Sequence, residues 1–422
     1  MTATNKPPSP ATVDMVPFLT SLIPWHRLDR LLLVALAGLI AFGSLFVYSA
    51  THNNDLFASA SWLRQPHFKQ IIFYGIGIGL AFLICLKDYN QLARWAQVFF
   101  WLSMITLVLV LIPGIGSERY GARRWFDLGI TQVQPSEMAK VAFILMMGQF
   151  LSRPRGELEQ HRVLLQALGL AAVPFLLILL EPDLGSSLMI LPTALAMMFV
   201  AGVPASFLKK LVGGMVLFVT LALSYVFFVP QNWKPIDLPD YQKRRLMVYF
   251  DADYAQQYAG TNATEAEVRR ARAMQRQDSY NVVQAMISVG SGGLTGKGWK
   301  QGIQTTHGYL PRGVAHNDFI FSVIAEESGF VGSTLVILLY GAIIAVGIRT
   351  AARCRDRLGK LLAVGVVTLL FSHVFVNIGM NIRLVPVTGL PLPLLSSGGS
   401  SVICSLMALG LLQNVRLYQK TI

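Results

Sequence analysis

The sequence is poor in charged residues and in cysteine. Only 14% of its 422 residues are Asp, Glu, Lys or Arg, whereas a soluble chain averages about 25%. Its three cysteines, Cys85, Cys354 and Cys404, offer no pair that resembles a disulfide framework. We also find no cluster of residues with the spacing of a zinc site. The composition therefore argues against an ordinary soluble domain and against a disulfide-stabilised or zinc-stabilised one.

Two further signals are missing. No basic segment followed by a cleavable apolar core begins the chain, so we predict no signal peptide and interpret residues 1–26 as a short disordered tail. The glycine-rich stretch ISVGSGGLTGKG resembles a phosphate-binding loop, but its spacing fails. Ser291 occupies the position of the first glycine, and Gly298 stands where Ser or Thr is required. We therefore reject a nucleotide triphosphatase.

Long apolar runs are abundant. The chain is 54% hydrophobic, with a mean hydropathy of +0.53, and crossing a bilayer takes about 20 apolar residues. We predict an all-α polytopic membrane protein with about ten transmembrane helices. The candidate spans are Leu31–Ala50, Gln70–Leu86, Val98–Pro113, Ser136–Leu151, Val163–Leu180, Ser186–Val203, Phe207–Val229, Phe319–Val346, Leu361–Leu384 and Leu394–Val415.

The basic residues indicate how this chain is oriented. With the N-terminus inside, the inner segments hold 17 lysines and arginines, and the short outer segments hold 6. The positive-inside rule thus explains the net charge of +13, and we predict no nucleic-acid partner. Both termini are predicted to be cytoplasmic, residues 27–422 to form the membrane domain, and residues 230–317 to form one large extracytoplasmic loop.

The large loop contains a helix signal. Thr264 and Glu267 have the spacing of a capping box, and the segment that continues to Arg276 is basic and rich in helix-forming residues. We predict a surface helix here that lies on the outer headgroups.

Four polar motifs near the spans need an explanation, because ionisable groups in membranes are costly. Glu137 and Lys140 share a helix face and suit either an internal ion pair or a cavity that receives an anion. Arg123 and Arg124 suit either phosphate binding or anchoring at the interface. The turn Glu181–Ser187 is either a tight connection or a source of acids that orient arginines. In the last motif, His373, Asn377 and Asn381 share one helix face and are predicted to hydrogen-bond neighbouring helices, and Arg383 follows them.

Three acids lie at the start of the eighth span. Asp318 stands at its outer end, and Glu326 lies about 12 Å deeper and is turned by about 80°. Glu327 is turned by about 180° from Asp318. The three acids therefore cannot act as one carboxylate pair. Asp318 either caps the helix or acts as a base at the water boundary, whereas Glu326 and Glu327 are predicted to be structural or ion-paired.

The motifs together resemble the SEDS family (shape, elongation, division and sporulation) and, within it, the rod-elongation branch, RodA. The matching pieces are GARRWFDLG, QPSEMAK, EPDLGSS, VGSGGLTGKG, HNDFIFSVIAEESGFVG and NIGMNIRLVPVTGLPLPLLSSGGSS. The chain departs from the family's usual motifs at Asn317, Arg312 and Ser397. The resemblance implies a peptidoglycan glycosyltransferase that polymerises lipid II on the outer face of the cytoplasmic (inner) membrane of a bacterium.

The resemblance also assigns roles. It identifies Asp318 as the catalytic base, and it implies a class B penicillin-binding transpeptidase and the MreB-associated elongation complex as partners, beside lipid II and membrane lipids. A divalent cation such as Mg²⁺ or Mn²⁺ is expected from the family alone. We expect His316, Asn317 and Glu137 to support the site, and cations to bind the diphosphate and sugar: Arg123, Arg124, Lys140, Lys297 and Arg383. A lipid II flippase, a silent scaffold and the division branch, FtsW, remain alternatives.

Overall fold

The computed structural model describes most of the chain outside its N-terminal tail. The described residues are 27–52, 65–119, 122–129, 131–228, 248–250, 264–310 and 313–419. The predicted tail 1–26, much of the first half of the large loop, and Arg312 lie outside them.

Ten long helices coincide with the ten predicted spans, and in the described residues eight of them are long and apolar enough to cross a membrane. The other two, α6 and α7, have 16 and 17 residues. The ten are α2 (Arg30–His52), α4 (Pro66–Cys85), α6 (Ala96–Leu111), α7 (Pro135–Leu151), α9 (His161–Leu180), α10 (Leu184–Ala201), α11 (Ala205–Phe228), α16 (Ile320–Arg353), α17 (Arg357–Asn381) and α18 (Gly399–Tyr418). The shorter helices α5 (Tyr89–Arg94), α8 (Arg155–Leu158) and α15 (Ile303–Thr306) lie in connections.

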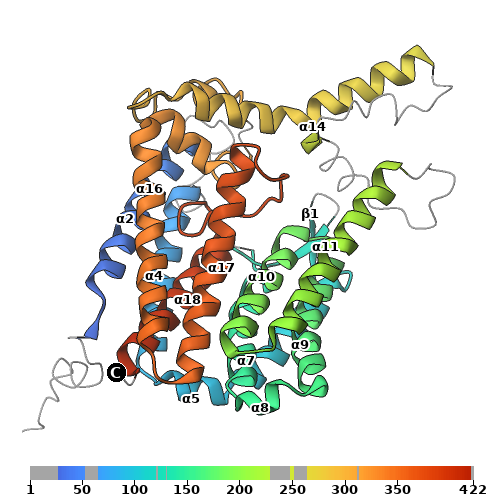
Figure 1. The fold of residues 1–422 in the computed structure, drawn as a ribbon. Helices are drawn as coiled ribbons and strands as arrows, with labels where there is room; N and C mark the ends of the chain where they lie inside the picture. Colours follow the sequence, from blue (N-terminus) through green and yellow to red (C-terminus); the bar gives the residue numbers. More distant parts are fainter. Residues whose placement is uncertain are drawn as a thin grey trace, which may run out of the picture.

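The helices pack around α17 and α18, which are the most buried of the eight apolar helices. Helix α18 packs against α4, and α17 packs against both α10 and α16. Small residues permit close approach: a side chain at Gly410 would meet the backbone of Ala81 at 2.8 Å. Helix α11 lies at the edge of the bundle (Figure 1) and has no buried residue in its apolar window. Its apolar side chains are thus available to lipid.

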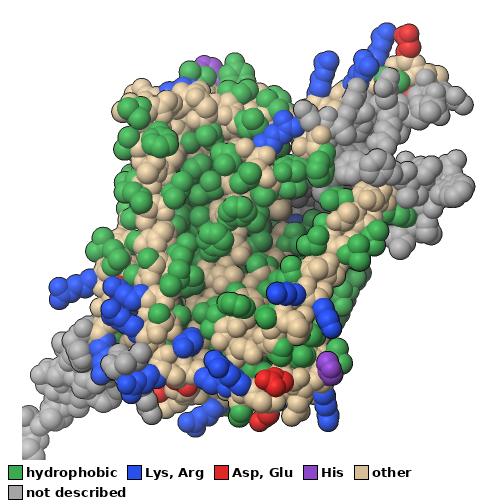
Figure 2. All heavy atoms as spheres, in the orientation of Figure 1, with side chains coloured by type: hydrophobic (Ala, Val, Ile, Leu, Met, Phe, Trp, Pro, Cys, Tyr) green, Lys and Arg blue, Asp and Glu red, His purple; other side chains and the backbone are tan. Residues whose placement is uncertain are grey.

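The two ends of the bundle differ. One end, which we call the outer end, carries a small antiparallel sheet with the strand order β1-β2-β3, formed by β1 (Ser117–Arg119), β2 (Ala122–Asp127) and β3 (Gln132–Val133). The sequence indicated only an outer loop there. Figure 2 shows lysines and arginines gathered at the opposite end on the face drawn. This distribution is the one expected if that end is cytoplasmic.

Helix α14 (Glu265–Ser291) lies across the outer end and projects beyond the bundle (Figure 1). The predicted capping box is confirmed, because the Glu267 amide donates to the Thr264 hydroxyl and the Glu267 carboxylate accepts from the Thr264 amide at 2.8 Å. The helix continues past the predicted end at Arg276 and packs against α16 and α17.

Helix α16 is broken at Gly329, where φ is 64° and ψ is −160°. The glycine-rich segment 292–298 docks into this break. The amide of Phe330 donates to the carbonyl of Gly293 at 2.9 Å, and the amide of Lys297 donates to the carbonyl of Glu326 at 3.0 Å. We call this docked arrangement of residues 292–298 against 326–331 the glycine-rich joint. It separates a short outer half-helix, residues 320–328, from the rest of α16.

Substitution of Gly329 by Ala should lower stability. A Cβ there would lie 2.3 Å from the amide nitrogen of Gly296, and a non-glycine residue in such a conformation costs of order 1–3 kcal/mol before any clash. Thermal unfolding in detergent, followed by intrinsic fluorescence, should show a lower midpoint. Gly341→Ala in the same helix is the control, because a Cβ there meets nothing within 4 Å. Equal midpoints for the two variants would contradict this account of the break.

Candidate functional site

Asp318 lies at the outer end, just before α16 begins at Ile320. It is half-buried. Its amide donates to the carbonyl of Val314 at 3.1 Å, so the backbone turns tightly here. The residue at the N-cap position of α16 is Phe319 rather than Asp318. Asp318 therefore stands one residue before the N-cap position of α16, and both roles of its side chain stay predictions.

Two asparagines of α17 hold the backbone at Asp318. The side-chain amides of Asn377 and Asn381 donate to the Asp318 carbonyl oxygen at 3.1 and 3.2 Å. Asn377 also donates to the carbonyl of Leu390 at 2.7 Å, and the Asn381 oxygen accepts from the Ser322 hydroxyl at 2.6 Å. The prediction that this stripe bonds neighbouring elements is confirmed for both asparagines. They fix the position of Asp318 through its backbone.

The loop before α18 holds the two residues in front of Asp318. The Ser396 hydroxyl donates to the Asn317 carbonyl at 2.6 Å, and the Ser397 amide donates to the His316 carbonyl at 2.9 Å. These contacts use the backbones of Asn317 and Ser397, where the chain departs from the family motif, so they do not depend on those side chains. Ser396 was not singled out from the sequence, although it lies within the quoted SSGGSS motif.

Glu137 and Lys140 form a buried ion pair in α7, with 2.7 Å between a Glu137 carboxylate oxygen and the Lys140 nitrogen. The Lys140 nitrogen also lies 3.0 Å from Nε2 of His373, the first residue of the α17 stripe. All three side chains line a cavity of about 30 Å³ between α7, α17 and α18. A water needs about 10–15 Å³ of such volume, so the cavity can hold water. The ion-pair interpretation is therefore confirmed, and the interpretation that the cavity receives an anion stays a prediction.

Arg123 and Arg124 bind different partners. Arg123 forms an exposed ion pair with Glu118 at 2.9 Å, whereas Nε of Arg124 donates to the Glu181 carbonyl at 2.9 Å and its Nη2 donates to the Pro182 carbonyl. Neighbouring residues of a strand point to opposite faces. The structure therefore does not bring the two guanidinium groups together, and Arg124 anchors β2 to the turn between α9 and α10.

The turn Glu181–Asp183 contains one satisfied acid and one that lacks hydrogen bonds. Asp183 accepts from the Ser186 amide at 3.0 Å and from the Gln134 side chain at 2.8 Å. Glu181 is fully buried, and neither carboxyl oxygen has a hydrogen-bond partner in the described residues. Burial first, and then the nearby Asp183, raise the pKa of Glu181 to about 9, against the opposing effect of Arg124.

The Glu181 pKa predicts that stability depends on pH. The folded pKa of about 9 exceeds the ordinary value of 4.5, so the folded state binds more protons between these values, and stability falls as pH rises through this window. Glu181→Gln should remove this dependence. Unfolding midpoints in detergent, measured from about pH 5 to about pH 9, should fall more steeply for the wild type. Glu118→Gln is an exposed control, and identical profiles for the wild type and Glu181→Gln would contradict the assignment.

The remaining candidate cations lie elsewhere on the outer end. Nζ of Lys297, in the glycine-rich joint, lies 2.6 Å from a Glu326 carboxylate oxygen. Arg383 follows α17 with a φ of 58°, and its guanidinium donates to the Val248 carbonyl at 3.2 Å. The predicted set is therefore spread over separate polar networks rather than gathered in one cationic cluster. Each of the five cations has a protein partner.

The described residues do not supply a ready divalent cation site. No three His, Cys, Asp or Glu side chains in the described part of the chain come together in a way that could hold a metal ion. The acids nearest in sequence to Asp318, Glu326 and Glu327, are buried and engaged by Lys297 and Ser49. The described residues alone thus form no such cluster, and the divalent cation expected from the family stays a prediction.

Known proteins resemble this chain over almost its full length. The sequence profile of the cell cycle protein family named for FtsW, RodA and SpoVE matches residues 29–421. The stage V sporulation protein E of Bacillus subtilis is 34% identical over 93% of this chain and 98% of its own length. The peptidoglycan glycosyltransferase MrdB of Escherichia coli K12 is 32% identical over 94% of this chain and 96% of its own.

Solved structures agree with this match. A chain in a study entitled "Structural coordination of polymerization and crosslinking by a peptidoglycan synthase complex" superposes with a TM-score of 0.71 at 28% identity, over 93% of this chain and 99% of that one. The helices, their order and the length matched are thus shared. This chain belongs to the FtsW, RodA and SpoVE family of cell cycle proteins, the SEDS family.

Proposed function

We propose that this protein polymerises lipid II into glycan strands at the outer face of the cytoplasmic membrane during cell elongation. It is a multi-pass bacterial membrane protein and a peptidoglycan glycosyltransferase, as the names of relatives about 32% identical over most of the chain indicate. The observation that carries the proposal is the placement of Asp318. A half-buried aspartate at the outer end is held through its backbone by Asn377 and Asn381.

The mechanism requires one base. The Asp318 carboxylate takes the proton from the 4-hydroxyl of the acceptor GlcNAc as that oxygen attacks C1 of the donor MurNAc. The bond between C1 and the diphosphate oxygen breaks, and undecaprenyl diphosphate leaves with the electron pair. A positioned base of this kind contributes about 10²–10⁴-fold. Because the backbone around Asp318 is fixed by hydrogen bonds from α17 and the loop before α18, little reorganisation is needed to use it.

Cations stabilise the charge that develops on the leaving diphosphate. Lys140 is the candidate that the structure supports best, because its ammonium group lines a cavity beside His373. Each of the five cations, Lys140 with its partner Glu137 included, would have to share or exchange a protein partner for the diphosphate. A divalent ion beside the diphosphate remains a proposal from the family resemblance, and no step here depends on it.

Partners and branch follow from the same family. The similar chain from a complex that coordinates polymerisation and crosslinking supports a transpeptidase partner, for which a class B penicillin-binding protein is the family choice. The motifs NIGM and PVTGLPLP favour the elongation branch over the division branch, and with it the MreB-associated complex. The basic residues at the end opposite α14 favour cytoplasmic termini (Figure 2).

Reconstitution tests the proposal against a lipid II flippase, which the buried Glu137, Lys140 and His373 cluster would also suit. Proteoliposomes that contain the chain and its transpeptidase partner receive labelled lipid II, and glycan strands are resolved on gels. A parallel assay follows movement of lipid II across the bilayer. Glycan strands that a muramidase digests support the polymerase, and movement without strands would overturn it.

A further inference from the structure

The half-helix that follows Asp318 carries a buried carboxylate, Glu326, that contacts three other segments of the chain. Residues 320–328 end at the break at Gly329, where the regular helix of α16 is interrupted. We propose that Glu326 is a positioning residue, which clamps the glycine-rich joint closed through Lys297 and thereby fixes the placement of Asp318. This inference rests on the proposed function, in which Asp318 is the base.

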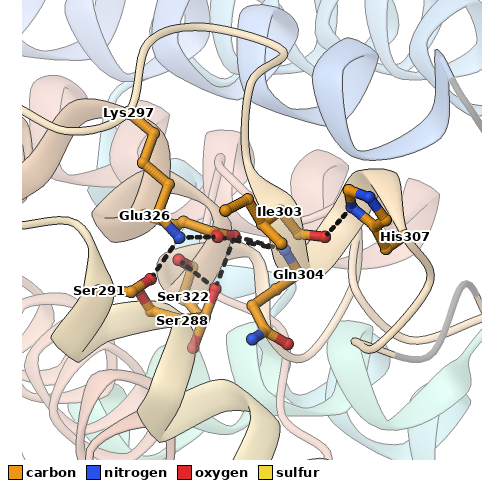
Figure 3. Close-up of polar contacts among 8 residues, drawn as sticks. All are labelled: Ser288, Ser291, Lys297, Ile303, Gln304, His307, Ser322 and Glu326. Carbon is orange, nitrogen blue, oxygen red and sulfur yellow. Dashed lines mark hydrogen bonds and ion pairs between the residues drawn. The ribbon is translucent and has the colours of Figure 1, made fainter.

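The contacts of Glu326 show a clamp built from three segments (Figure 3). One carboxylate oxygen accepts from Nζ of Lys297 at 2.6 Å and from the amide of Gln304 at 3.1 Å. The other accepts from the Ser288 hydroxyl of α14 at 3.1 Å. The side chain is fully buried. A buried charge is tolerated only when it is paired and hydrogen-bonded, so this carboxylate holds α14, the joint and the start of α15 together.

Backbone hydrogen bonds hold the joint together beside the Glu326 side chain. The amides of Lys297 and Gly298 donate to the carbonyls of Glu326 and Glu327, both at 3.0 Å. A side chain at Gly296 would lie 2.1 Å from the Glu327 carbonyl oxygen, so the approach is as close as glycine allows. The half-helix is thus held near both of its ends, at Glu326 by the joint and at Asp318 by Asn377 and Asn381.

Two lysines of the same loop provide a test and a control for the role of Glu326. Lys297 contacts the clamp, whereas Lys300 lies three residues on and packs over the rings of Tyr48 and Trp299 at 4.3 and 4.6 Å. We expect Glu326→Gln and Lys297→Met to reduce the kcat of polymerisation by up to about 100-fold, because a displacement of about 1 Å can have that effect. The KM for lipid II should change little, and Lys300→Met should retain the normal kcat.

A disulfide across the joint supplies the rescue. The Val331 amide donates to the Leu294 carbonyl at 3.1 Å, and both side chains are exposed. Leu294→Cys with Val331→Cys places one cysteine on each side of this hydrogen bond, and mass spectrometry checks that the disulfide forms on oxidation; the native cysteines, which are buried, should not compete. Glu326→Gln alone should lower kcat by up to about 100-fold. In this background, oxidation of the two cysteines should restore kcat to within about three-fold of the wild-type value. Reduction of the disulfide should lower kcat again. The same cysteines with Glu326 intact serve as the control.

Amide hydrogen exchange gives a readout that does not need activity. Glu326→Gln should speed exchange in residues 292–304 and 313–328 and leave α18 unchanged. Unchanged exchange overturns the proposal, as does faster exchange with a normal kcat or an oxidised joint that fails to restore kcat. If wild-type proteoliposomes make no glycan, the proposed function fails instead, and faster exchange would still support the clamp.

Discussion

Asp318→Asn is expected to reduce glycan synthesis by about 10²–10⁴-fold, the contribution of a positioned general base. Asparagine has the same shape as aspartate but cannot accept the proton. The hydrogen bonds with Val314, Asn377 and Asn381 are made by its backbone, and the substitution leaves them in place. The variant should therefore fold normally and bind lipid II, and the loss should appear in kcat. Initial rates are measured in proteoliposomes with the transpeptidase partner.

Two further variants make this result interpretable. Asp318→Glu keeps the carboxylate but moves it by one methylene, so it should retain more activity than Asp318→Asn. Asp88→Asn changes a half-buried aspartate that caps α5 at the opposite end, where asparagine caps equally well, and it should behave as the wild type. A normal rate for folded Asp318→Asn would remove Asp318 as the base.

The sequence predicted the helices well because hydrophobic run length is a strong local signal. A helix lies at each of the ten predicted spans, eight of them long and apolar enough to cross a membrane, and Thr264 with Glu267 gave the start of α14 correctly. The end of α14 was not predicted, because its second half depends on packing against α16 rather than on composition. The small sheet was missed because β1 and β3 are only three and two residues long.

The site was predicted by residue but not by arrangement. Helical geometry placed Glu326 on a different face from Asp318, and the structure confirms that it is ion-paired, with Lys297. Lys297 could not be predicted as its partner. The joint depends on the break at Gly329 and on a segment about thirty residues earlier in the chain, and hydrophobic periodicity carries no information on such long-range contacts. Likewise, the sequence suggested that Arg123 and Arg124 act together. Both lie in strand β2, which directs neighbouring side chains to opposite faces, and the strand was not predicted.

Lys140→Met is expected to destabilise the protein by about 3–5 kcal/mol, the range for removing one partner of a buried ion pair. Glu137 would then keep a buried carboxylate without its cation, because the side chains of both residues are almost fully buried. The double variant Glu137→Gln with Lys140→Met removes both charges, so it should recover most of the stability. Arg123→Gln breaks an exposed pair and should change stability by at most about 1 kcal/mol. Unfolding midpoints in detergent measure all three.

The double variant then decides what Lys140 is for. If the lysine serves only the ion pair with Glu137, restored stability should bring restored polymerisation. If its ammonium group also stabilises the leaving diphosphate from the cavity beside His373, the double variant should be stable and still slow. We expect the second outcome, because His373 approaches the same nitrogen at 3.0 Å from another helix, and an ion pair alone does not need a third polar partner and a cavity that can hold water. A stable double variant with normal turnover would leave Lys140 a structural role only.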